Sequence, residues 1–323
     1  MTEGEIIARM RELFPQRGAS VGIGDDAAVV GEQVITTDML IEDVDFTRVV
    51  PVQSIARKSL AVNLSDLAAM GAIPAFAVLA LGIPQWLVAG LDPFLRALAD
   101  CARQYDIDLI GGDLSRAEKL TIVVTATGWL EARPLLRSGA RVGDRVYVSR
   151  PIGGAAAGLE LLTRWQSTEP PRDLPYAQRE FALSAIRAQT DPDPEVKLGI
   201  ALAALGEVTS CIDISDGLST DLHHLCESSG VGAELERQRI PLFPDLLDAG
   251  GALGIDVRSA VLHGGEEYAL LFTSAFREAD LSTRLGRPVY AIGRIAESGI
   301  RIDGETLEAG GFDHFNRTMN DER

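Results

Sequence analysis

The sequence predicts a two-domain protein of the α/β (α+β) class, and three observations support that prediction. The chain has 323 residues, enough for two domains of ordinary size. Through about residue 137, runs rich in β-forming or apolar residues alternate with stretches of helical spacing. The next segment starts afresh, with a Gly-Asp turn, the strand-like RVYVS and a glycine-rich corner that leads into a helix. We therefore expect one domain at 1–137 and another at 138–323.

The elements of the first domain follow from hydrophobic periodicity. Strands are expected at 34–41, 75–83 and 119–130, and helices at 54–72 and 92–106. The first residues of the chain predict an amphipathic helix with an apolar side made of Ile6, Ile7, Met10, Leu13 and Phe14.

Composition and charge exclude several classes of function. The net charge of -17 argues against binding a nucleic-acid backbone, which requires a basic face. No stretch approaches the ~18 apolar residues of a membrane span, and the N-terminus lacks the layout of a signal peptide, so we expect a cytoplasmic protein. The cysteines form no CxxC pair and are expected to be buried small side chains: Cys101, Cys211 and Cys226.

Common phosphate-binding signatures are missing from the sequence. It contains no GxxxxGK[ST] loop and no HRD and DFG pair. GGAAAG at 153–158 lacks the GxGxxG spacing and is interpreted as helix packing. His223 and His224 form no HExxH motif and are interpreted as surface or core residues of a helix.

Carboxylates instead recur among apolar residues, first as Asp25 and Asp26 in GIGDDAAVV at 22–30. An unpaired buried carboxylate is costly, so it normally has a partner or a metal ion. Because successive side chains of a strand face opposite ways, only one of the two can line a common site. A turn followed by a strand is the alternative explanation.

The strand-like VITTDML adds hydroxyl and carboxylate oxygens, ligands of the kind that Mg²⁺ prefers, at Thr36, Thr37 and Asp38. The residues after it add three acids that a solvated loop explains equally well: Glu42, Asp43 and Asp45.

The helical stretch 58–72, KSLAVNLSDLAAMGA, is apolar nearly all round, which is typical of a buried helix. Asn63 and Asp66 are three residues apart and share one face of it. Either they form a structural hydrogen-bond pair or they face a metal ion.

Two later segments place carboxylates at corners of the chain. In 106–117, two glycines allow close approach to a ligand and deliver Asp113, unless this is a tight turn with a capping aspartate. In DISDGL, Asp213 and Ser215 alternate onto one strand face. Ser215 or the aspartate after it can cap a helix that begins near Gly217. Several Mg²⁺ ions that join carboxylates to a polyphosphate would account for all five segments.

These motifs, together with RSGARVGDRVYVS, GGEEYALLF and the terminal GGFDHF, closely resemble the thiamine-monophosphate kinases over essentially the whole chain. NLSDLAAMGA with DxSDGL is typical of the wider aminoimidazole ribonucleotide synthetase-like superfamily, whereas GGEEYALLF and the late aromatic residue indicate the kinases. The resemblance implies the two-domain superfamily fold, with the N-terminal sheets of two subunits pairing in a homodimer. It implies direct in-line transfer of the γ-phosphoryl group of ATP to thiamine monophosphate, giving thiamine diphosphate, with several Mg²⁺ ions.

The resemblance also implies roles for individual residues. Metal ligands are expected at Asp26, Thr37, Asp38, Asp66, Asp113, Asp213 and Asp216. Nucleotide contacts are expected at Gly112, Asp113, Arg137 and Ser215, and substrate contacts at Asp45, Glu266 and Phe312. Asp213 and Arg137 are the expected catalytic residues, because the guanidinium fork of an arginine can stabilise charge on the moving phosphoryl group.

The chain departs from the family pattern in two places. Asp45 stands where the family has a histidine, and Asp43 stands where it has a glycine. The family's basic proline stretch is acidic here, at Asp191, Asp193 and Glu195. Two alternatives therefore stay open: another ATP-using enzyme of the superfamily, or a non-catalytic nucleotide-binding regulator.

Overall fold

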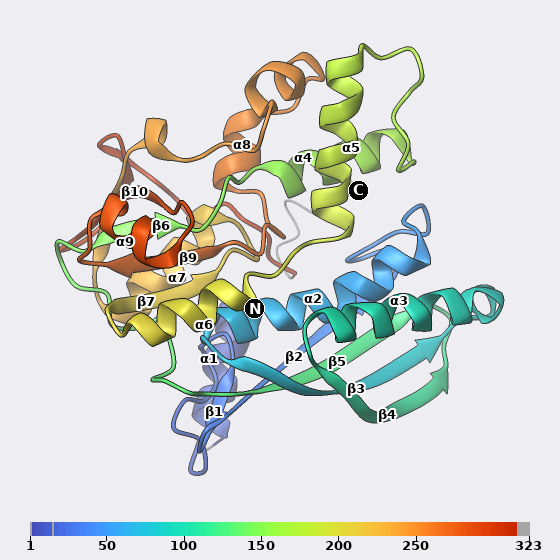
Figure 1. Ribbon diagram of the computed structural model, residues 1–323, viewed down its shortest axis with the longest axis horizontal. Helices are drawn as coiled ribbons and strands as arrows, with labels where there is room; N and C mark the ends of the chain where they lie inside the picture. The colour runs from blue at the N-terminus through green and yellow to red at the C-terminus, as the bar shows by residue number, and fades with distance from the viewer. Residues whose placement is uncertain (1, 15, 315–323) are drawn as a thin grey trace.

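Two mixed sheets organise the computed structural model, which describes residues 2–14 and 16–314; residues 1, 15 and 315–323 lie outside it (Figure 1). The first sheet has the strand order β1-β2-β5-β3-β4. Its strands are β1 (Ala28–Val30), β2 (Gln33–Ile41), β3 (Ile73–Ile83), β4 (Asp108–Arg116) and β5 (Thr121–Trp129). Neighbouring strands are antiparallel except β3 and β4, which are parallel.

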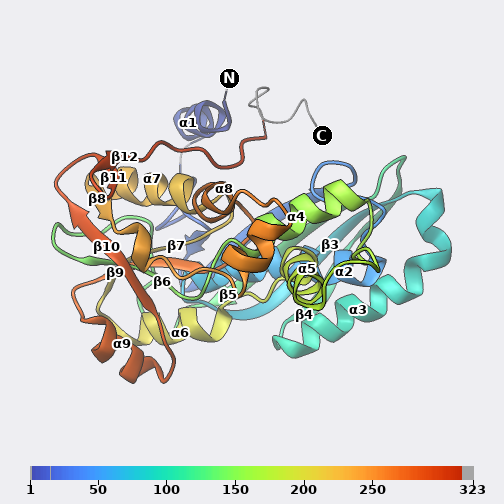
Figure 2. The same ribbon diagram turned by 90° about the horizontal axis from the view of Figure 1, so that it is seen from above.

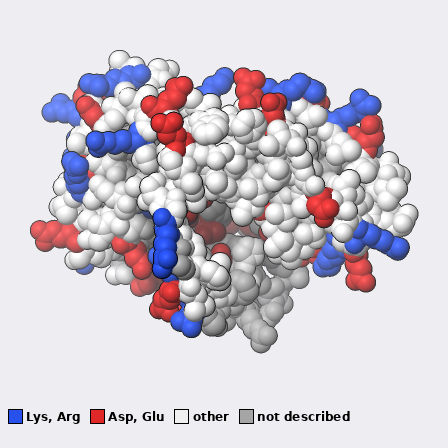
Figure 3. Space-filling view, turned by 90° about the horizontal axis from the view of Figure 1, so that it is seen from below, with Lys and Arg blue, Asp and Glu red and all other residues white. Residues whose placement is uncertain are grey.

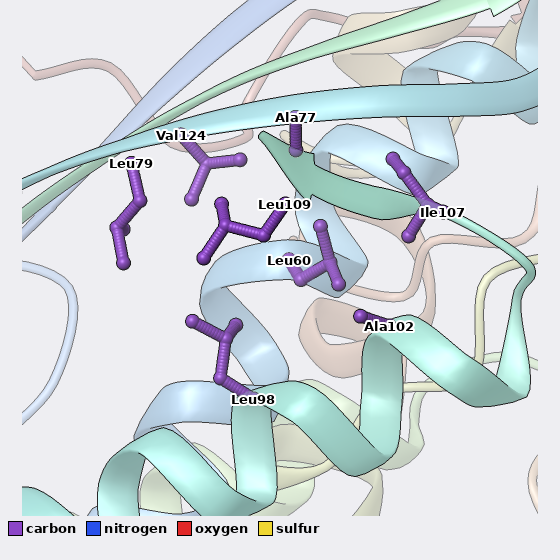
Figure 4. A pocket seen from close by; sticks show the side chains of 8 residues that line it. All are labelled: Leu60, Ala77, Leu79, Leu98, Ala102, Ile107, Leu109 and Val124. Atoms are coloured by element: carbon purple, nitrogen blue, oxygen red, sulfur yellow. The ribbon is translucent and has the colours of Figure 1, made fainter. Parts of the chain in front are cut away.

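Two helices, α2 (Val52–Ala69) and α3 (Leu91–Gln104), cover one face of this sheet (Figure 1). A short 3-10 helix at Gln85–Gly90 precedes α3. Leu60 of α2 and Leu98 of α3 meet the strands around a cavity of only about 10 Å³ (Figure 4). Because its lining is entirely apolar, so small a space holds no ordered water, and the region is close-packed core.

The opposite face of the first sheet is exposed and apolar. The exposed fractions are 54% for Met39, 39% for Val78 and 45% for Trp129. Every residue of the edge strand β4 is exposed, including Ile110 and Leu114. An exposed apolar face beside an open edge strand is typical of a protein–protein interface.

The second sheet has the order β12-β11-β8-β10-β6-β9-β7. Its strands are β6 (Arg145–Val148), β7 (Val208–Asp213), β8 (Gly232–Leu235), β9 (Leu270–Ser274), β10 (Tyr290–Ala296), β11 (Ile300–Ile302) and β12 (Glu305–Thr306). The helices of this half are α4 (Gly154–Trp165), α5 (Tyr176–Thr190), α6 (Val196–Leu205), α7 (Leu218–Ser229), α8 (Val257–Leu262) and α9 (Glu278–Leu285), with short helical segments at Arg237–Arg239 and Leu246–Gly250.

Strand alternation divides the second half between two cores. Val146 and Val148 lie in one core, with residues of α4, α7 and α8, whereas Tyr147 between them lies in the core that α6 shares with α2. Gly199 of α6 approaches α2 so closely that a Cβ there would lie 2.0 Å from the carbonyl oxygen of Ala68. The connector 130–144 separates the two sheets along the chain, and we propose that the domain boundary lies within it.

Most of the predicted elements are confirmed, with two differences. The N-terminal helix exists as α1 (Glu3–Leu13), but none of its residues is buried. The expected Gly-Gly-Asp corner is wrong, because β4 continues through these residues, with a shift in its pairing with β3 at Ile110. Gly112 has φ +152° there, and a Cβ would lie 1.8 Å from the carbonyl oxygen of Leu79, so close strand approach explains the glycine.

The three cysteines are buried and free, as predicted. GGAAAG serves helix packing, since a Cβ on Gly158 would lie 2.1 Å from the carbonyl oxygen of Ala185 on α5. Among the described residues, no helix is both long and apolar enough to cross a bilayer.

Candidate active site

Three carboxylates from distant parts of the chain converge between the two sheets. Asp26 lies in the turn before β1, Asp66 lies on α2, and Asp213 ends β7. One oxygen of each lies within 4.8 Å of the others. Seen from below, acidic side chains are visible inside a hollow of the surface (Figure 3). Because like charges this close repel strongly, the cluster requires protons or a bound cation.

Hydroxyl groups hold two of these carboxylates in place. The Thr36 hydroxyl donates to Asp66, and the Ser65 hydroxyl donates to Oδ2 of Asp213 at 2.5 Å. Ser65 precedes Asp66 on α2, so this one helix supplies Asp66 and also holds Asp213 in place.

Asp38 on β2 is the fourth acid of the site. Its backbone N–H donates to Oδ1 of Asn63 at 3.2 Å, and its buried side chain lies beside Asp66. Burial raises the pKa of Asp38 to about 6. The polar stripe that the sequence predicts on α2 therefore faces β2, where it makes structural hydrogen bonds and also supplies an acid to the cluster.

Arg137 lies against the cluster. Its Nε and Nη2 donate to Oδ1 of Asp26 at 2.8 and 2.5 Å, and its backbone N–H donates to Asp25 at 3.1 Å. Both aspartates lie before β1 rather than within a strand, and of the two only Asp26 joins the cluster with Asp66 and Asp213. The other oxygen of Asp26, Oδ2, is buried and has no hydrogen-bond partner within residues 2–14 and 16–314. A bound cation would give that oxygen a partner. The single positive charge of Arg137 does not balance three carboxylates, so a further cation fits the charge of this cluster.

Burial is the main cause of the shifted pKa values in this cluster. Desolvation raises the pKa of Asp26 to about 7, that of Asp213 to about 6, and that of Asp66 well above its usual range. Arg137 opposes this effect at Asp26, and the neighbouring acids reinforce it at Asp66. Buried carboxylates that resist ionisation by themselves are readily stabilised as anions by a hard cation, so the oxygen donor set fits Mg²⁺.

A second acidic group lies at the start of α7. Asp216, Asp221 and His224 each place one ligand atom within 4.8 Å of the others. Asp221 accepts from the N–H groups of Asp216 and Gly217 at 3.2 and 3.0 Å, so the predicted cap by Ser215 or Asp216 is wrong. Burial raises the pKa of Asp216 to about 6 and lowers that of His224. Asp221 thus holds the turn that leads into the helix, and no side chain of the described residues caps the helix itself.

Thr37, Gly112 and Asp113 do not reach the carboxylate cluster within this chain. Thr37 faces the exposed side of the sheet, where its hydroxyl lies 3.0 Å from that of Thr125. Gly112 and Asp113 lie on the exposed edge strand β4, separated from β2 by β5 and β3. Thr36, rather than Thr37, supplies the hydroxyl that contacts the cluster.

Two of the predicted substrate residues lie near a pocket of about 280 Å³. Asp45 lines this pocket, which lies between the loop after β2 and the helices α4 and α5, where these helices lie over α2 (Figure 2). Lys58 and Gln189 also line it, and both contact Glu266. The pocket wall is therefore connected to the GGEEY segment.

Phe312 and Ser215 lie at the start of α7 and are not among the residues that line that pocket. The N–H of Phe312 donates to the carbonyl of Asp216 at 3.1 Å, and its ring packs edge-on against His314. The carbonyl of Ser215 accepts from the N–H of Glu266 at 2.7 Å, so the DISDGL and GGEEY segments are adjacent.

The acids that replace the family's basic stretch bind other residues of this chain. They pair as Asp191 with Arg57, Asp193 with Tyr105, and Glu195 with Arg287. The solvated-loop explanation of 42–45 is wrong for Glu42, which is fully buried and accepts from the N–H of Leu120 at 2.9 Å and from Trp86 Nε1 at 3.1 Å.

Sequence reasoning missed four residues that contact the candidate site: Lys58, Ser65, Gln189 and Asp221. Lys58 and Ser65 carried the same signal as Asn63, a polar side chain on an apolar helix. For Gln189 the sequence holds no local signal.

Comparison with known proteins defines the class first. Residues 24–130 match the family described as AIR synthase related protein, N-terminal domain, and residues 141–303 match the corresponding C-terminal domain. The chain thus has the two-domain fold of the AIR synthase related proteins. The crystal structure of a HypE–HypF complex, with a TM-score of 0.71 at 21% identity, shows this fold alone.

Within that class, the chain is similar to thiamine-monophosphate kinases. The thiamine-monophosphate kinase of Haemophilus influenzae is 34% identical over 98% of each chain, and that of Escherichia coli (strain K12) is 37% identical over 97% of this chain and 98% of its own. A solved structure of AaThiL complexed with AMPPCP and TMP matches with a TM-score of 0.86 at 31% identity, over 97% of each chain. The chain belongs to the thiamine-monophosphate kinase family.

Proposed function

We propose that this protein transfers the γ-phosphoryl group of ATP directly to the phosphate of thiamine monophosphate, giving thiamine diphosphate. The observation that carries the proposal is the cluster of Asp26, Asp66 and Asp213 beside Arg137, in which one buried carboxylate oxygen has no partner among the residues that the structure describes. The relatives' names and the AMPPCP and TMP complex support the choice of the two substrates.

The donor set fits Mg²⁺, which would be held by Asp26, Asp38, Asp66 and Asp213. When bound, Mg²⁺ supplies positive charge that neutralises the phosphate oxygens. The chain's own contribution is positioning. Ser65 and Thr36 orient the carboxylates, and Arg137, whose Nε and Nη2 hold Asp26, would bring its positive charge to the phosphate oxygens. In-line transfer requires mainly such positioning and charge stabilisation.

We further propose that the protein is a homodimer that pairs through its first sheets. The exposed apolar face and the open edge strand β4 support this proposal. A partner subunit that covers that face would also lie close to Thr37 and Asp113. Their predicted roles, as metal ligands and for Asp113 also as a nucleotide contact, would then be met at the subunit interface rather than within one chain. Light scattering should show a dimer for the wild type and a monomer for Ile110→Lys/Leu114→Lys.

The first experiment is an assay of the purified protein with ATP, Mg²⁺ and thiamine monophosphate, detecting thiamine diphosphate. Free thiamine serves as the negative acceptor, and Asp213→Asn is the site variant. Product from the wild type alone, and only from the phosphorylated acceptor, supports the proposal. Mg²⁺-dependent ATP binding without any product would contradict it and favour a regulator or another enzyme of the superfamily.

A further inference from the structure

One wall of the pocket between the loop after β2 and helices α4 and α5 comes from a single short segment. Five consecutive residues, 43–47, line the pocket, and they belong to the loop that joins β2 to α2. The volume of the pocket, about 280 Å³, is close to the ~300 Å³ lower end for ligand pockets. A wall that already has its bound shape spares the ligand the cost of ordering the loop.

Hydrogen bonds inside this loop fold it into a tight turn. The N–H groups of Val44 and Asp45 donate to the carbonyl of Ile41 at 3.1 and 2.9 Å. The N–H of Asp43 donates to the carbonyl of Phe46 at 2.8 Å. Asp43 has φ +66°, a backbone conformation that non-glycine residues seldom adopt, and such strain persists only where surrounding contacts hold the backbone in place. The turn therefore requires support from residues outside it.

Glu42, the residue before the turn, provides support at the start of the loop. Its side chain is fully buried. Its Oε2 accepts from the N–H of Leu120 at 2.9 Å and from Trp86 Nε1 at 3.1 Å, and its Oε1 accepts from Nε of Arg48. Leu120 directly precedes β5, and Trp86 lies in the 3-10 helix between β3 and α3. The start of the loop is thus fixed to two other parts of the first domain.

Arg48 connects the far end of the loop to the same carboxylate. It directly follows the five lining residues, so its bond to Glu42 brings the two ends of the loop together. Its guanidinium carbon lies 5.2 Å from the ring centre of Trp86, within the range of a cation–π contact. The side chain is 59% exposed, and Arg48 is not among the residues that line the pocket. It can therefore act on a ligand in the pocket only through the loop.

We propose that Arg48 is a positioning residue for the acceptor substrate. By joining Glu42 and Trp86, it holds residues 43–47 in the shape that binds thiamine monophosphate. The inference rests on the proposed function, since that function supplies the ligand. Asp45, a predicted substrate contact, lies in this loop, so a shift of the loop also moves its carboxylate relative to a bound ligand.

The test measures kcat and the KM of both substrates for the wild type and for Arg48→Met, which replaces the guanidinium group with an uncharged side chain. Arg96→Met is the matched control, because Arg96 also forms an exposed ion pair, with Asp92, and does not line the pocket. Arg48→Met should raise KM for thiamine monophosphate roughly three- to tenfold. Because Arg48 is not part of the carboxylate cluster, kcat and KM for ATP should stay unchanged. Arg96→Met should change none of these constants.

A second variant separates the support of the loop from the charge of Arg48. Trp86→Phe keeps a ring beside the arginine and every charge of the chain, but it removes the Nε1 donor to Glu42. It should also raise KM for thiamine monophosphate, by roughly two- to fivefold. In the double variant the loss should be smaller than the product of the two single losses, because both residues act through Glu42.

An unchanged KM for thiamine monophosphate in Arg48→Met would overturn the inference and leave the kinase function standing. An equal rise in the KM of both substrates would also overturn it, because general loss of structure has that effect. If Trp86→Phe behaves as the wild type, the effect belongs to the charge of Arg48 and the inference fails.

A wild type that forms no thiamine diphosphate would remove the proposed function. The dissociation constant of thiamine monophosphate, measured by calorimetry for the same proteins, then tests Arg48 separately. Weaker binding to Arg48→Met than to the wild type and Arg96→Met would support its role. Equal binding, or binding to none of these proteins, would overturn it.

Discussion

Replacing Asp26 with asparagine should make the metal-free protein more stable and the enzyme inactive. The Asp26 side chain is fully buried beside Asp66 and Asp213, and burial raises its pKa from the usual 3.8 to about 7. At ~1.4 kcal/mol per pH unit, ionising it in the folded state costs on the order of 4 kcal/mol. This figure already includes the attraction of Arg137, which lowers the pKa.

The sign of the pH dependence follows from the raised pKa. The folded state binds the proton more tightly, so this stabilisation is complete below about pH 4 and is lost as the pH rises through about 7. Asparagine resembles the protonated acid and keeps that stabilisation. The free energy of unfolding of Asp26→Asn should therefore exceed that of the wild type by up to ~4 kcal/mol at pH 8 in EDTA, with a gap that closes near pH 4.

The assay is thermal and chemical unfolding of both proteins in EDTA at pH 4 and pH 8, repeated with Mg²⁺ at pH 8. Mg²⁺ should raise the wild-type Tm much more than that of Asp26→Asn, because the variant lacks one ligand. Asp92→Asn is the control, since Asp92 forms an exposed ion pair with Arg96 and should change the stability by less than ~1 kcal/mol. A variant that melts at or below the wild type in EDTA at pH 8 would refute the reasoning.

Three further predictions concern individual side chains. Gly112→Ala should destabilise the fold by ~2 kcal/mol or more in urea unfolding, because its Cβ would strike the carbonyl of Leu79, whereas Gly111→Ala has room and should cost under ~1 kcal/mol; equal losses would contradict this. Glu42→Gln should cost ~2 kcal/mol in the same measurement, because an amide N–H₂ would face buried donors, and an unchanged midpoint would argue against it. Asp45→Asn should raise KM for thiamine monophosphate roughly three- to tenfold with little change in kcat, since a negative charge near the cationic ring is lost; an unaltered KM would count against a substrate role.

Helical periodicity explains why part of the site could be predicted from the sequence. The 3.6-residue repeat places Asn63 and Asp66 on one face of an otherwise apolar helix, and both face β2 in the structure. For the strand at 34–40, the sequence did not show which side chains face inward. In VITTDML both alternating sets contain apolar residues and a threonine, so the sequence could not decide between Thr36 and Thr37 as the inward hydroxyl.

Other parts of the site depend on contacts that no local pattern contains. Arg137 meets Asp26 across more than a hundred residues, and only the family resemblance linked the two. The two glycines before Asp113 have the composition of a turn, yet β3 lies alongside and pairs with them as strand residues. Tertiary pairing here overrides local turn propensity.

The acidic replacements after α5 connect the end of this helix to the first domain. Asp191 pairs with Arg57 of α2 at 2.6 Å, and Asp193 accepts from the hydroxyl of Tyr105 at 2.5 Å. Both contacts tie the end of α5 to the first domain, one residue or a few residues beyond Gln189 and Thr190. These two acids of the segment therefore join the second half of the chain to α2 and to the end of α3, and they are separate from the cluster of Asp26, Asp66 and Asp213.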